Sequence, residues 1–297
     1  MNTLPDLPCY LNGEYTTLPN AKISVMDRGF IFGDGIYEVV PVYAGRLFRF
    51  DHHMARLERS LKECRIPNPH SRAEWAGIIG SLVTRYAASQ GIQAEASDQL
   101  IYLQITRGVA LRDHVMPADI TPTVFVMTNA MKPVPAEQRS QGVACVTADD
   151  FRWEKAHIKS TSLLGAVFAR QISFDVGAIE TVMFRDGWLT EASASNVLIV
   201  RGGAIVAPPK DHQILPGITY DATIEFAREA GMPMEIRPVR REEALSADEM
   251  WLSSSTKEVL AITTLDGRPF GSGVPGPVFR RMYAAFQAHK PAASRRA

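Results

Sequence analysis

The sequence has few cysteines, no excess of charge of either sign and no long apolar run. Its three cysteines, Cys9, Cys64 and Cys145, are isolated and odd in number, which argues against a disulfide framework and against a structural zinc site. The 32 basic and 32 acidic residues leave a formal net charge of +0. Neither nucleic acid nor an anionic membrane is therefore indicated as a partner.

No apolar run approaches the roughly 20 residues that are needed to cross a bilayer. The N-terminal sequence MNTLPDLPCYLNGEY lacks the basic and apolar regions of a signal peptide. We therefore expect a soluble, cytoplasmic protein that acts on small molecules and has no nucleic acid, membrane or metal as a partner.

The composition is that of an ordinary globular protein. The 297 residues are 46% hydrophobic and 22% charged, and the chain is long enough for two modest domains. Apolar spacing predicts helices over residues 51–64 and 72–90. Runs of β-branched and aromatic residues predict buried strands over residues 99–106 and 123–128.

Residues 131–137 hold two prolines and no periodicity, so we interpret them as a linker between domains 1–130 and 138–297. The second of these domains contains Lys159, which is discussed below. Regular β-α alternation is absent from the first third of the chain. We expect an α+β fold of two domains with mostly antiparallel sheets.

In the second domain, the sequence predicts three strands over residues 180–207, separated by turns at 185–187 and 201–203. Helices are predicted at about 217–230 and 275–289.

Lysine is rare, and one of the eight lysines has unusual neighbours. Ile158 precedes Lys159 and a small, mostly apolar run follows it, whereas Lys155 and Lys257 lie beside glutamates and suit solvated positions. Burial disfavours the ammonium form of a lysine, and a Schiff base requires the neutral amine. Taken alone, a lysine before a helix is more often a surface charge.

Glu191 lies between two predicted strands and allows two interpretations. It could pair with the protonated ring nitrogen of a pyridine cofactor. It could also belong to a turn whose polar groups, Ser193, Ser195 and Asn196, satisfy one another.

Three further segments suit a phosphate group. Leu215–Thr219 leads into a helix, where free amides and the Thr219 hydroxyl favour an anion, although Thr219 is equally suited to be a plain N-cap. The hydroxyls of residues 253–256 follow a strand. Arg56 projects from the first long helix and could supply positive charge, or it could be a solvated helix arginine.

Arg112 and His114 lie two residues apart on a loop after the strand over 99–106. On an extended backbone such a pair points to the same side and could clamp a carboxylate. An arginine and a histidine at this spacing are also frequent by chance.

Six segments in a fixed order make the sequence similar to one family. Together they resemble the fold-type IV pyridoxal-phosphate transaminases over about residues 10–287, and within that class the D-amino-acid transaminases of the D-alanine type. The segments are DRGFIFGDGIYEVV, FRFDHHMARL, TRGVALRDH, IKSTSLLGA, LTEASASNV and LPGIT.

The resemblance implies a role for each matching residue. Lys159 would carry pyridoxal 5′-phosphate as a Schiff base and move a proton between the substrate α-carbon and C4′ of the cofactor. Glu191 would pair with the pyridine nitrogen, and Leu215 would pack on the ring. The phosphate would be held by Arg56, the amides of Ile218 and Thr219, and Ser255.

The resemblance also implies how the substrate is bound. Tyr37, Arg112 and His114 would receive the substrate carboxylate, with the arginine and the histidine supplied by the partner subunit of a homodimer that shares its active sites. The reaction would be ping-pong amino transfer between a D-amino acid, such as D-alanine or D-glutamate, and a 2-oxo acid.

Three positions depart from the family pattern. Ala194 stands where the D-alanine type usually has serine, and Pro216 and Tyr220 also differ from the usual residues. From the resemblance we expect these changes to affect a hydrogen bond near the cofactor and the rate or the substrate range, but they leave Lys159, Glu191 and Arg56 intact.

Alternative activities share this fold. They are transamination of branched-chain L-amino acids, transamination of (R)-amines, and aminodeoxychorismate lyase chemistry. The Arg112–His114 pair argues against the first two, because it suits the carboxylate of a D-substrate, whereas the lyase shares the lysine and the glutamate. A catalytically silent scaffold is a third class, which the presence of Lys159, Glu191 and Arg56 disfavours.

Overall fold

The computed structural model describes residues 4–296 and contains two compact units. Unit 1 extends to Met131 and includes Ile158–Leu163, and unit 2 comprises Lys132–His157 and the chain from Leu164 onward. This division differs from the one predicted, because the segment that carries Lys159 groups with unit 1. The reason is a contact between residues distant in sequence, since Ile158 packs into the hydrophobic core of unit 1.

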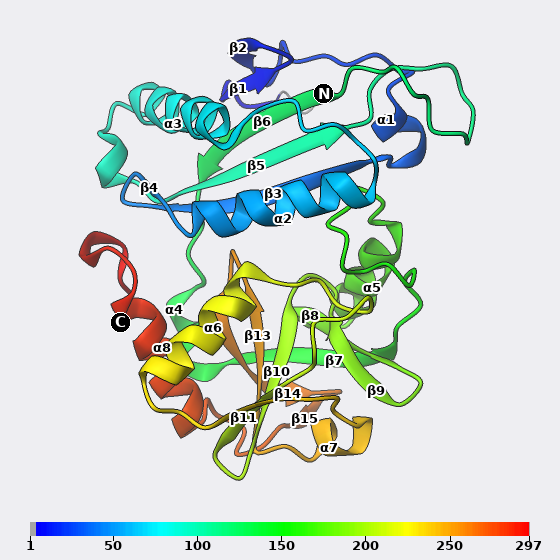
Figure 1. Cartoon of the computed structure of the whole chain (residues 1–297). Helices are drawn as coiled ribbons and strands as arrows, with labels where there is room; N and C mark the ends of the chain where they lie inside the picture. The colour runs from blue at the N-terminus through cyan, green and yellow to red at the C-terminus, as the bar shows by residue number, and fades with distance from the viewer. Residues whose placement is uncertain (1–3, 297) are drawn as a thin grey trace. The chain divides into compact units, whose positions relative to one another are not determined.

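The sheet of unit 1 is antiparallel throughout, with the strand order β2-β1-β6-β5-β3-β4 (Figure 1). Strands β3 and β5 pair along their length, from Gly35 opposite Thr106 to Val42 opposite Gln99. The predicted strands are confirmed. The strands are β1 (Pro8–Leu11), β2 (Glu14–Thr17), β3 (Gly35–Tyr43), β4 (Arg46–Leu47), β5 (Gln99–Thr106) and β6 (Thr123–Ala130).

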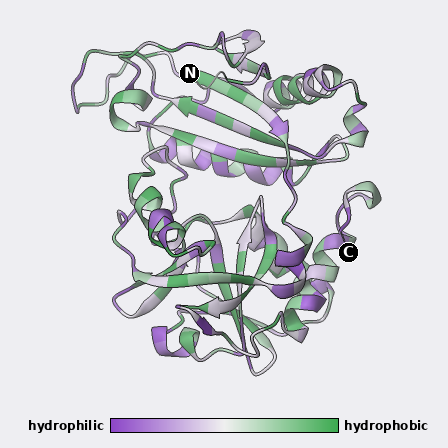
Figure 2. Ribbon diagram, turned by 180° about the vertical axis from the view of Figure 1, so that it is seen from behind, coloured by the Kyte–Doolittle hydropathy of each residue, from purple (hydrophilic) through white to green (hydrophobic). Residues whose placement is uncertain are grey.

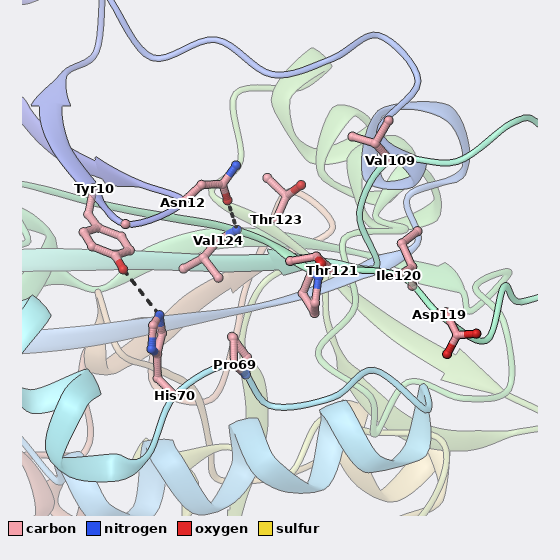
Figure 3. A pocket seen from close by; sticks show the side chains of 12 residues that line it. Tyr10, Asn12, Pro69, His70, Val109, Asp119, Ile120, Thr121, Thr123 and Val124 are labelled. Carbon is pink, nitrogen blue, oxygen red and sulfur yellow. Dashed lines mark hydrogen bonds between the residues drawn. The ribbon is translucent and has the colours of Figure 1, made fainter.

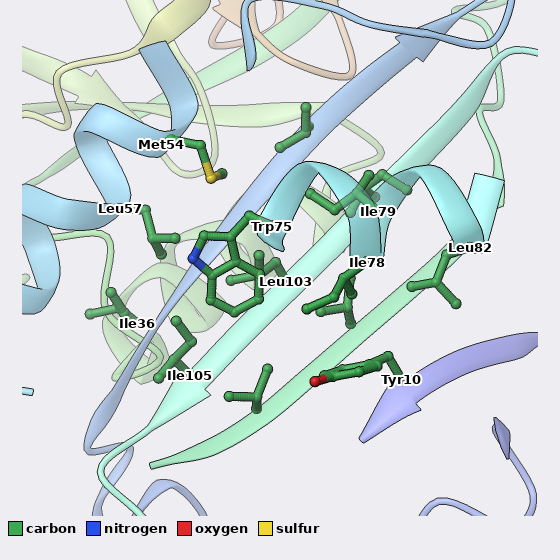
Figure 4. Packing of buried hydrophobic residues seen from close by; sticks show 14 of the residues in the cluster. Tyr10, Ile36, Met54, Leu57, Trp75, Ile78, Ile79, Leu82, Leu103 and Ile105 are labelled. Carbon is green, nitrogen blue, oxygen red and sulfur yellow. The ribbon is translucent and has the colours of Figure 1, made fainter. Parts of the chain in front are cut away.

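Helices cover the sheet of unit 1 and bury its apolar residues. Trp75 of α3 is fully buried and packs in one cluster with Met54 and Leu57 of α2 and Leu103 of β5 (Figure 4). Both long predicted helices are confirmed to within one residue at each end. The helices are α1 (Arg28–Phe32), α2 (Phe50–Glu63), α3 (Arg72–Ser89) and the 3₁₀ turn η1 (Ala94–Ala96).

The sheet of unit 2 is mixed, with parallel pairs at β11/β12, β14/β7 and β7/β8. Its order is β12-β11-β10-β13-β14-β7-β8-β9, with β15 paired to β14. Its strands are β7 (Val143–Asp149), β8 (Glu180–Arg185), β9 (Trp188–Ala192), β10 (Asn196–Arg201), β11 (Ala204–Ala207), β12 (Met234–Ile236), β13 (Glu249–Ser254), β14 (Glu258–Leu265) and β15 (Arg268–Pro269).

One prediction in this sheet was wrong. The middle strand expected between the two turns is interrupted at residues 193–195, so that β9 and β10 are separate strands. They pair with different neighbours, because β9 pairs with β8 whereas β10 pairs with β11 and β13. The interruption is where the carboxylate of the buried Glu180 accepts hydrogen bonds from the backbone and from serine hydroxyls.

The helices of unit 2 include the two that were predicted, α6 and α8. Apolar residues make up much of the strands in both units (Figure 2), which agrees with an α+β fold built on two separate cores. Along residues 4–296, no helix combines the length and the apolar character that a membrane span requires. The helices of unit 2 are α4 (Ala136–Gln141), α5 (Leu164–Asp175), α6 (Ile218–Glu229), α7 (Arg241–Leu245), α8 (Pro277–Ala288) and η2 (Ala292–Ser294).

Candidate functional site

The predicted site residues fall into two groups, one in each unit. Unit 1 holds Tyr37, Arg56, Arg112, His114 and Lys159, and unit 2 holds Glu191, Leu215, Ile218, Thr219 and Ser255.

Lys159 lies on a short extended segment that is attached to the start of β3. The backbone amide of Tyr37 donates to the carbonyl of Lys159 at 3.0 Å, and the amide of Thr161 donates to the carbonyl of Gly35 at 2.9 Å. The Lys159 amine lies 4.1 Å from the centre of the Tyr37 ring, within the range of a cation–π contact. The fold therefore brings the proposed cofactor lysine and a proposed substrate residue together.

Arg56 is buried, so the interpretation of a solvated helix arginine was wrong. Its Nε and Nη2 donate to the two carboxylate oxygens of Glu38, each at 2.7 Å, and Nδ1 of His53 lies 2.8 Å from the same carboxylate. Burial alone would raise the pKa of Glu38, but Arg56 and His53 hold that pKa well below its usual range. The sequence analysis did not identify Glu38 as a site residue. The signal that could have indicated it is an acidic residue within the apolar segment YEVV.

Arg112 and His114 lie on the exposed loop that follows β5, and both contact Phe32 of α1. The ring centres of Phe32 and His114 are 5.4 Å apart, and the Arg112 guanidinium carbon lies 5.4 Å from the centre of the Phe32 ring. The pair is therefore brought together at one aromatic side chain.

Glu191 is buried and accepts three hydrogen bonds within unit 2. The donors are Nη1 of Arg152 at 2.6 Å, the side-chain amide of Asn196 at 3.0 Å and the backbone amide of Leu215 at 3.1 Å. The same Asn196 amide also donates to the carbonyl of Leu215 at 2.9 Å. Asn196, the first residue of β10, therefore orients the Glu191 carboxylate and holds Leu215 beside it.

The sequence analysis did not identify Arg152 as a site residue. It lies in the segment DDFRW, two positions after Asp150. Its Nε and Nη2 donate to Asp150 at 2.9 and 2.8 Å, and the backbone carbonyl of Arg152 accepts from Arg185 at 2.7 Å. Burial raises the pKa of Glu191 to about 7, even though the Arg152 charge acts in the opposite direction. A buried acid that titrates near neutrality is typical of functional sites.

This raised pKa predicts a pH-dependent contribution to stability. Between the ordinary value of 4.5 and about 7, the folded protein keeps a proton on Glu191 that the unfolded chain has released. The contribution is therefore fully present at low pH and is lost as the pH rises through about 7. In the cofactor-free protein, we expect the melting temperature of the wild type to fall relative to that of Glu191→Gln between about pH 5 and about pH 7.5. A flat or rising difference would contradict this.

The start of α6 provides backbone amides where they were predicted. Gly217, rather than Thr219, is the N-cap residue, so the amides of Ile218 and Thr219 begin the first turn of the helix. Within the described chain, no side chain caps this end of the helix with a hydrogen bond. Gly217 is required by its contact with Asn196, because a Cβ would lie 2.1 Å from the side-chain oxygen of Asn196. Ser255 lies half-buried in the turn between β13 and β14.

Lys257 is in that same turn, and the expectation that it is solvated was wrong. Its Nζ lies 2.7 Å from the carboxylate of Glu180, which is only 1% exposed. Glu180 also accepts from the Ser195 hydroxyl at 2.5 Å and from the backbone amide of Ala194 at 2.7 Å. At Ala194, which departs from the family pattern, the backbone amide thus still contacts Glu180. Tyr220, which also departs from that pattern, is fully buried, and its hydroxyl donates to the carbonyl of Pro208 at 2.7 Å.

A cavity of about 590 Å³ in unit 1 lies elsewhere (Figure 3). It is lined on one side by Tyr10, whose hydroxyl is 3.4 Å from Nε2 of His70, and on the other by Asp119 and Thr121. None of the predicted site residues lines it, so this cavity is not part of the candidate site.

Each unit holds groups of the kinds that pyridoxal phosphate requires. In unit 2, the buried Glu191 is a carboxylate of the kind that suits a pyridinium nitrogen, and the first turn of α6 offers amides that suit a phosphate. In unit 1, the buried Arg56 is a cation that suits a phosphate. The aldehyde requires an amine, and Lys159 lies half-buried in the same unit as Arg56.

Comparison with known proteins identifies the family. The family model and the sequence relatives show a pyridoxal-phosphate-dependent aminotransferase. The chain belongs to the amino-transferase class IV family, whose model matches residues 35–265.

The chain is similar in sequence to D-alanine aminotransferases. It is 37% identical to that of Bacillus licheniformis over 276 residues, which cover 93% of this chain and 94% of the relative. It is 34% identical to that of Staphylococcus aureus over 279 residues, which cover 94% and 96% of the two chains.

Solved structures share the fold. The branched-chain amino acid aminotransferase of Escherichia coli superposes with a TM-score of 0.86 at 24% identity, covering 98% of this chain and 96% of the other. A fold IV transaminase from Curtobacterium pusillum superposes with a TM-score of 0.80 at 25% identity, covering 96% and 94%.

Proposed function

We propose that this aminotransferase moves amino groups between D-amino acids of the D-alanine and D-glutamate type and 2-oxo acids by a ping-pong mechanism. The observation that carries the proposal is that Arg112 and His114, on the loop after β5, both lie against the Phe32 ring. An arginine and a histidine at one place suit a substrate carboxylate. The names of the relatives that are 34–37% identical support the same activity.

Each residue then has a defined task. When bound, pyridoxal phosphate supplies an aldehyde that exchanges amino groups and a ring that withdraws electrons from the substrate α-carbon. The Lys159 amine would hold the cofactor, and it would also carry the proton that leaves or returns to the substrate α-carbon. Glu191 keeps the ring nitrogen protonated, and Arg152 and Asn196 hold the Glu191 carboxylate in place.

The remaining residues bind the two ends of the reactants. In unit 2, the amides of Ile218 and Thr219 and the hydroxyl of Ser255 would bind the cofactor phosphate, and Leu215 would pack against the ring. In unit 1, Arg56, which Glu38 orients, would supply positive charge to a phosphate. Tyr37 joins Arg112 and His114 at the substrate carboxylate.

We also propose a cytoplasmic homodimer in which Arg112 and His114 serve the active site of the other subunit. Apolar residues of the same loop support this, because Leu111 and Val115 are 87% and 71% exposed in the single chain. Exposed apolar groups of this kind mark surfaces that are covered on assembly. Free cysteines at all three positions suit a reducing compartment.

A paired donor assay tests the proposed activity. With 2-oxoglutarate as acceptor, we expect D-alanine to be a far better donor than L-leucine. In Arg112→Ala, the KM for D-alanine should rise about tenfold or more, because hydrogen bonds between charged groups are worth about 1.5–3 kcal/mol. Retention of the cofactor, followed by its absorbance, should be unchanged.

Arg72→Ala is the matched control, because Arg72 is an exposed arginine of unit 1 that pairs with Glu58. Its KM should equal that of the wild type. An unchanged KM in Arg112→Ala would refute the carboxylate clamp. A preference for L-leucine would favour branched-chain transamination, and amino transfer from (R)-amines without a carboxylate would favour an amine transaminase. Pyruvate release from aminodeoxychorismate would favour the lyase.

A further inference from the structure

The short helix α1 lies beside the loop that follows β5 (Figure 1) and contacts the proposed carboxylate clamp at several points. We propose that Phe32 and Arg28 of α1 are positioning residues of this clamp, which hold Arg112 and His114 in the geometry that receives a substrate carboxylate. The inference rests on the proposed function, and it assigns a task to the motif DRGFIF that the family roles leave without one.

Phe32 is a common platform for the charged side chains of the clamp. Its ring centre lies 5.4 Å from that of His114 and 5.4 Å from the guanidinium carbon of Arg112, while the guanidinium carbon of Arg28 lies 4.8 Å from it. Arginines favour aromatic faces, because the negative face of the ring attracts the guanidinium charge. Both clamp side chains are exposed, so few other contacts restrict their rotamers.

Arg28 holds the backbone between the two clamp residues. It is buried, its Nη1 donates to the carbonyl of Asp113 at 2.6 Å, and its Nε donates to the carboxylate of Asp34 at 2.8 Å. The backbone amide of Arg28 also donates to the carbonyl of Gly108 at 2.8 Å. Asp113 lies between Arg112 and His114. The hydrogen bond from Arg28 to the Asp113 carbonyl therefore determines the direction in which both side chains leave the loop.

The helix itself is fixed to the end of β5. Asp27, its N-cap, is fully buried and accepts from the amide of Gly29 at 2.8 Å and from the hydroxyl of Thr106 at 3.0 Å. A Cβ on Gly29 would lie 2.2 Å from the Thr106 methyl group, so the helix packs against the strand without space for a side chain there. The platform is therefore rigid although the loop that it supports is exposed.

The other end of α1 contacts the segment of Lys159. The carbonyl of Gly33, the C-cap residue with φ of +67°, accepts from the hydroxyls of Thr161 at 2.8 Å and Ser162 at 2.9 Å. One five-residue helix thus contacts both the cofactor segment and the clamp loop of unit 1. A change in Phe32 should affect the clamp alone, because these contacts with the lysine segment are made by Gly33.

The test compares Phe32→Leu with Phe30→Leu in the holoenzyme. Phe30 belongs to the same helix, but it is 69% exposed, so it is a matched control. We expect Phe32→Leu to raise the KM for D-alanine about fivefold with kcat within about twofold, since it weakens substrate binding and leaves the proton transfer unchanged. Phe32→Tyr keeps the aromatic platform and should restore the wild-type KM, and Phe30→Leu should have no effect.

A double variant separates positioning from a general loss of packing. If Phe32 acts through Arg112, Phe32→Leu should add little to the KM of Arg112→Ala, because coupled residues are not additive. A full additional fivefold rise in the double variant, or an equal effect of Phe30→Leu, would overturn the proposal.

Tryptic cleavage after Arg112 provides a readout that does not depend on the reaction. We expect the clamp loop to be cleaved several-fold faster in Phe32→Leu than in Phe30→Leu, because a loop that has lost its platform opens more often. Equal cleavage rates would refute positioning even in an enzyme that is active on D-alanine. If D-alanine is not a substrate at all, the proposed function fails, and the cleavage rates still decide whether Phe32 orders the loop.

Discussion

Replacement of Lys159 by alanine is expected to abolish transamination and to remove the visible absorbance of covalently bound pyridoxal phosphate. The amine has two tasks in the proposed mechanism, attachment of the cofactor and proton transfer at the α-carbon. Loss of a positioned acid–base group alone reduces a rate by about 10²–10⁴-fold. Turnover with D-alanine, followed together with the absorbance spectrum, measures both tasks.

Lys155→Ala is the control for this variant, because Lys155 is an exposed lysine only four positions earlier. It should keep both the absorbance and the turnover of the wild type. The Lys159→Ala protein should remain folded, since the side chain's contact with Tyr37 is a single cation–π interaction. Full turnover by folded Lys159→Ala would end the assignment of this lysine.

Replacement of Arg152 by methionine is expected to destabilise unit 2 by about 3 kcal/mol, since it removes the buried cation that pairs with Glu191 and leaves Asp150 with Arg185 alone. Arg152 is the partner of both Asp150 and Glu191, and both carboxylates lie almost wholly inside the protein. Denaturant unfolding of the cofactor-free protein measures the change. Cofactor affinity should also fall, because Glu191 would lose the cation that favours its charged form.

Arg237→Met is the matched control. Arg237 also pairs with two carboxylates of unit 2, Glu235 and Glu243, but its side chain is 38% exposed. Exposed ion pairs contribute about 0–1 kcal/mol, so the free energy of unfolding should change by less than about 1 kcal/mol. A similar loss in the two variants would show that burial of the Arg152 network has no special importance for stability.

Much of the secondary structure could be predicted because it depends on local patterns. The alternating and β-branched residues of Gln99–Thr106 form β5 with the predicted bounds, and the apolar spacing over 51–64 and 72–90 produces α2 and α3. The interruption at 193–195 could not be predicted in this way. Its cause is the carboxylate of Glu180, which is more than ten residues distant.

The position of Lys159 in the fold could not be predicted from local patterns either. The single linker at residues 131–137 was predicted from proline content and missing periodicity, and both are local properties of the chain. The segment Ile158–Leu163 groups with unit 1 because Ile158 packs in the core of unit 1 and because Lys159 pairs with the backbone of β3, to which it is distant in sequence.

By itself, the sequence determined the family and which side chains are candidates for the site, because motif order and residue type are properties of the chain alone. Only the tertiary structure decided their partners, namely Glu38 for Arg56, Arg152 for Glu191, Glu180 for Lys257 and Phe32 for the clamp. The physical reason is that burial and charge pairing depend on which residues lie close together in the folded chain. Arg152 and Glu191 are separated by 39 positions in the chain, yet their side chains meet at 2.6 Å.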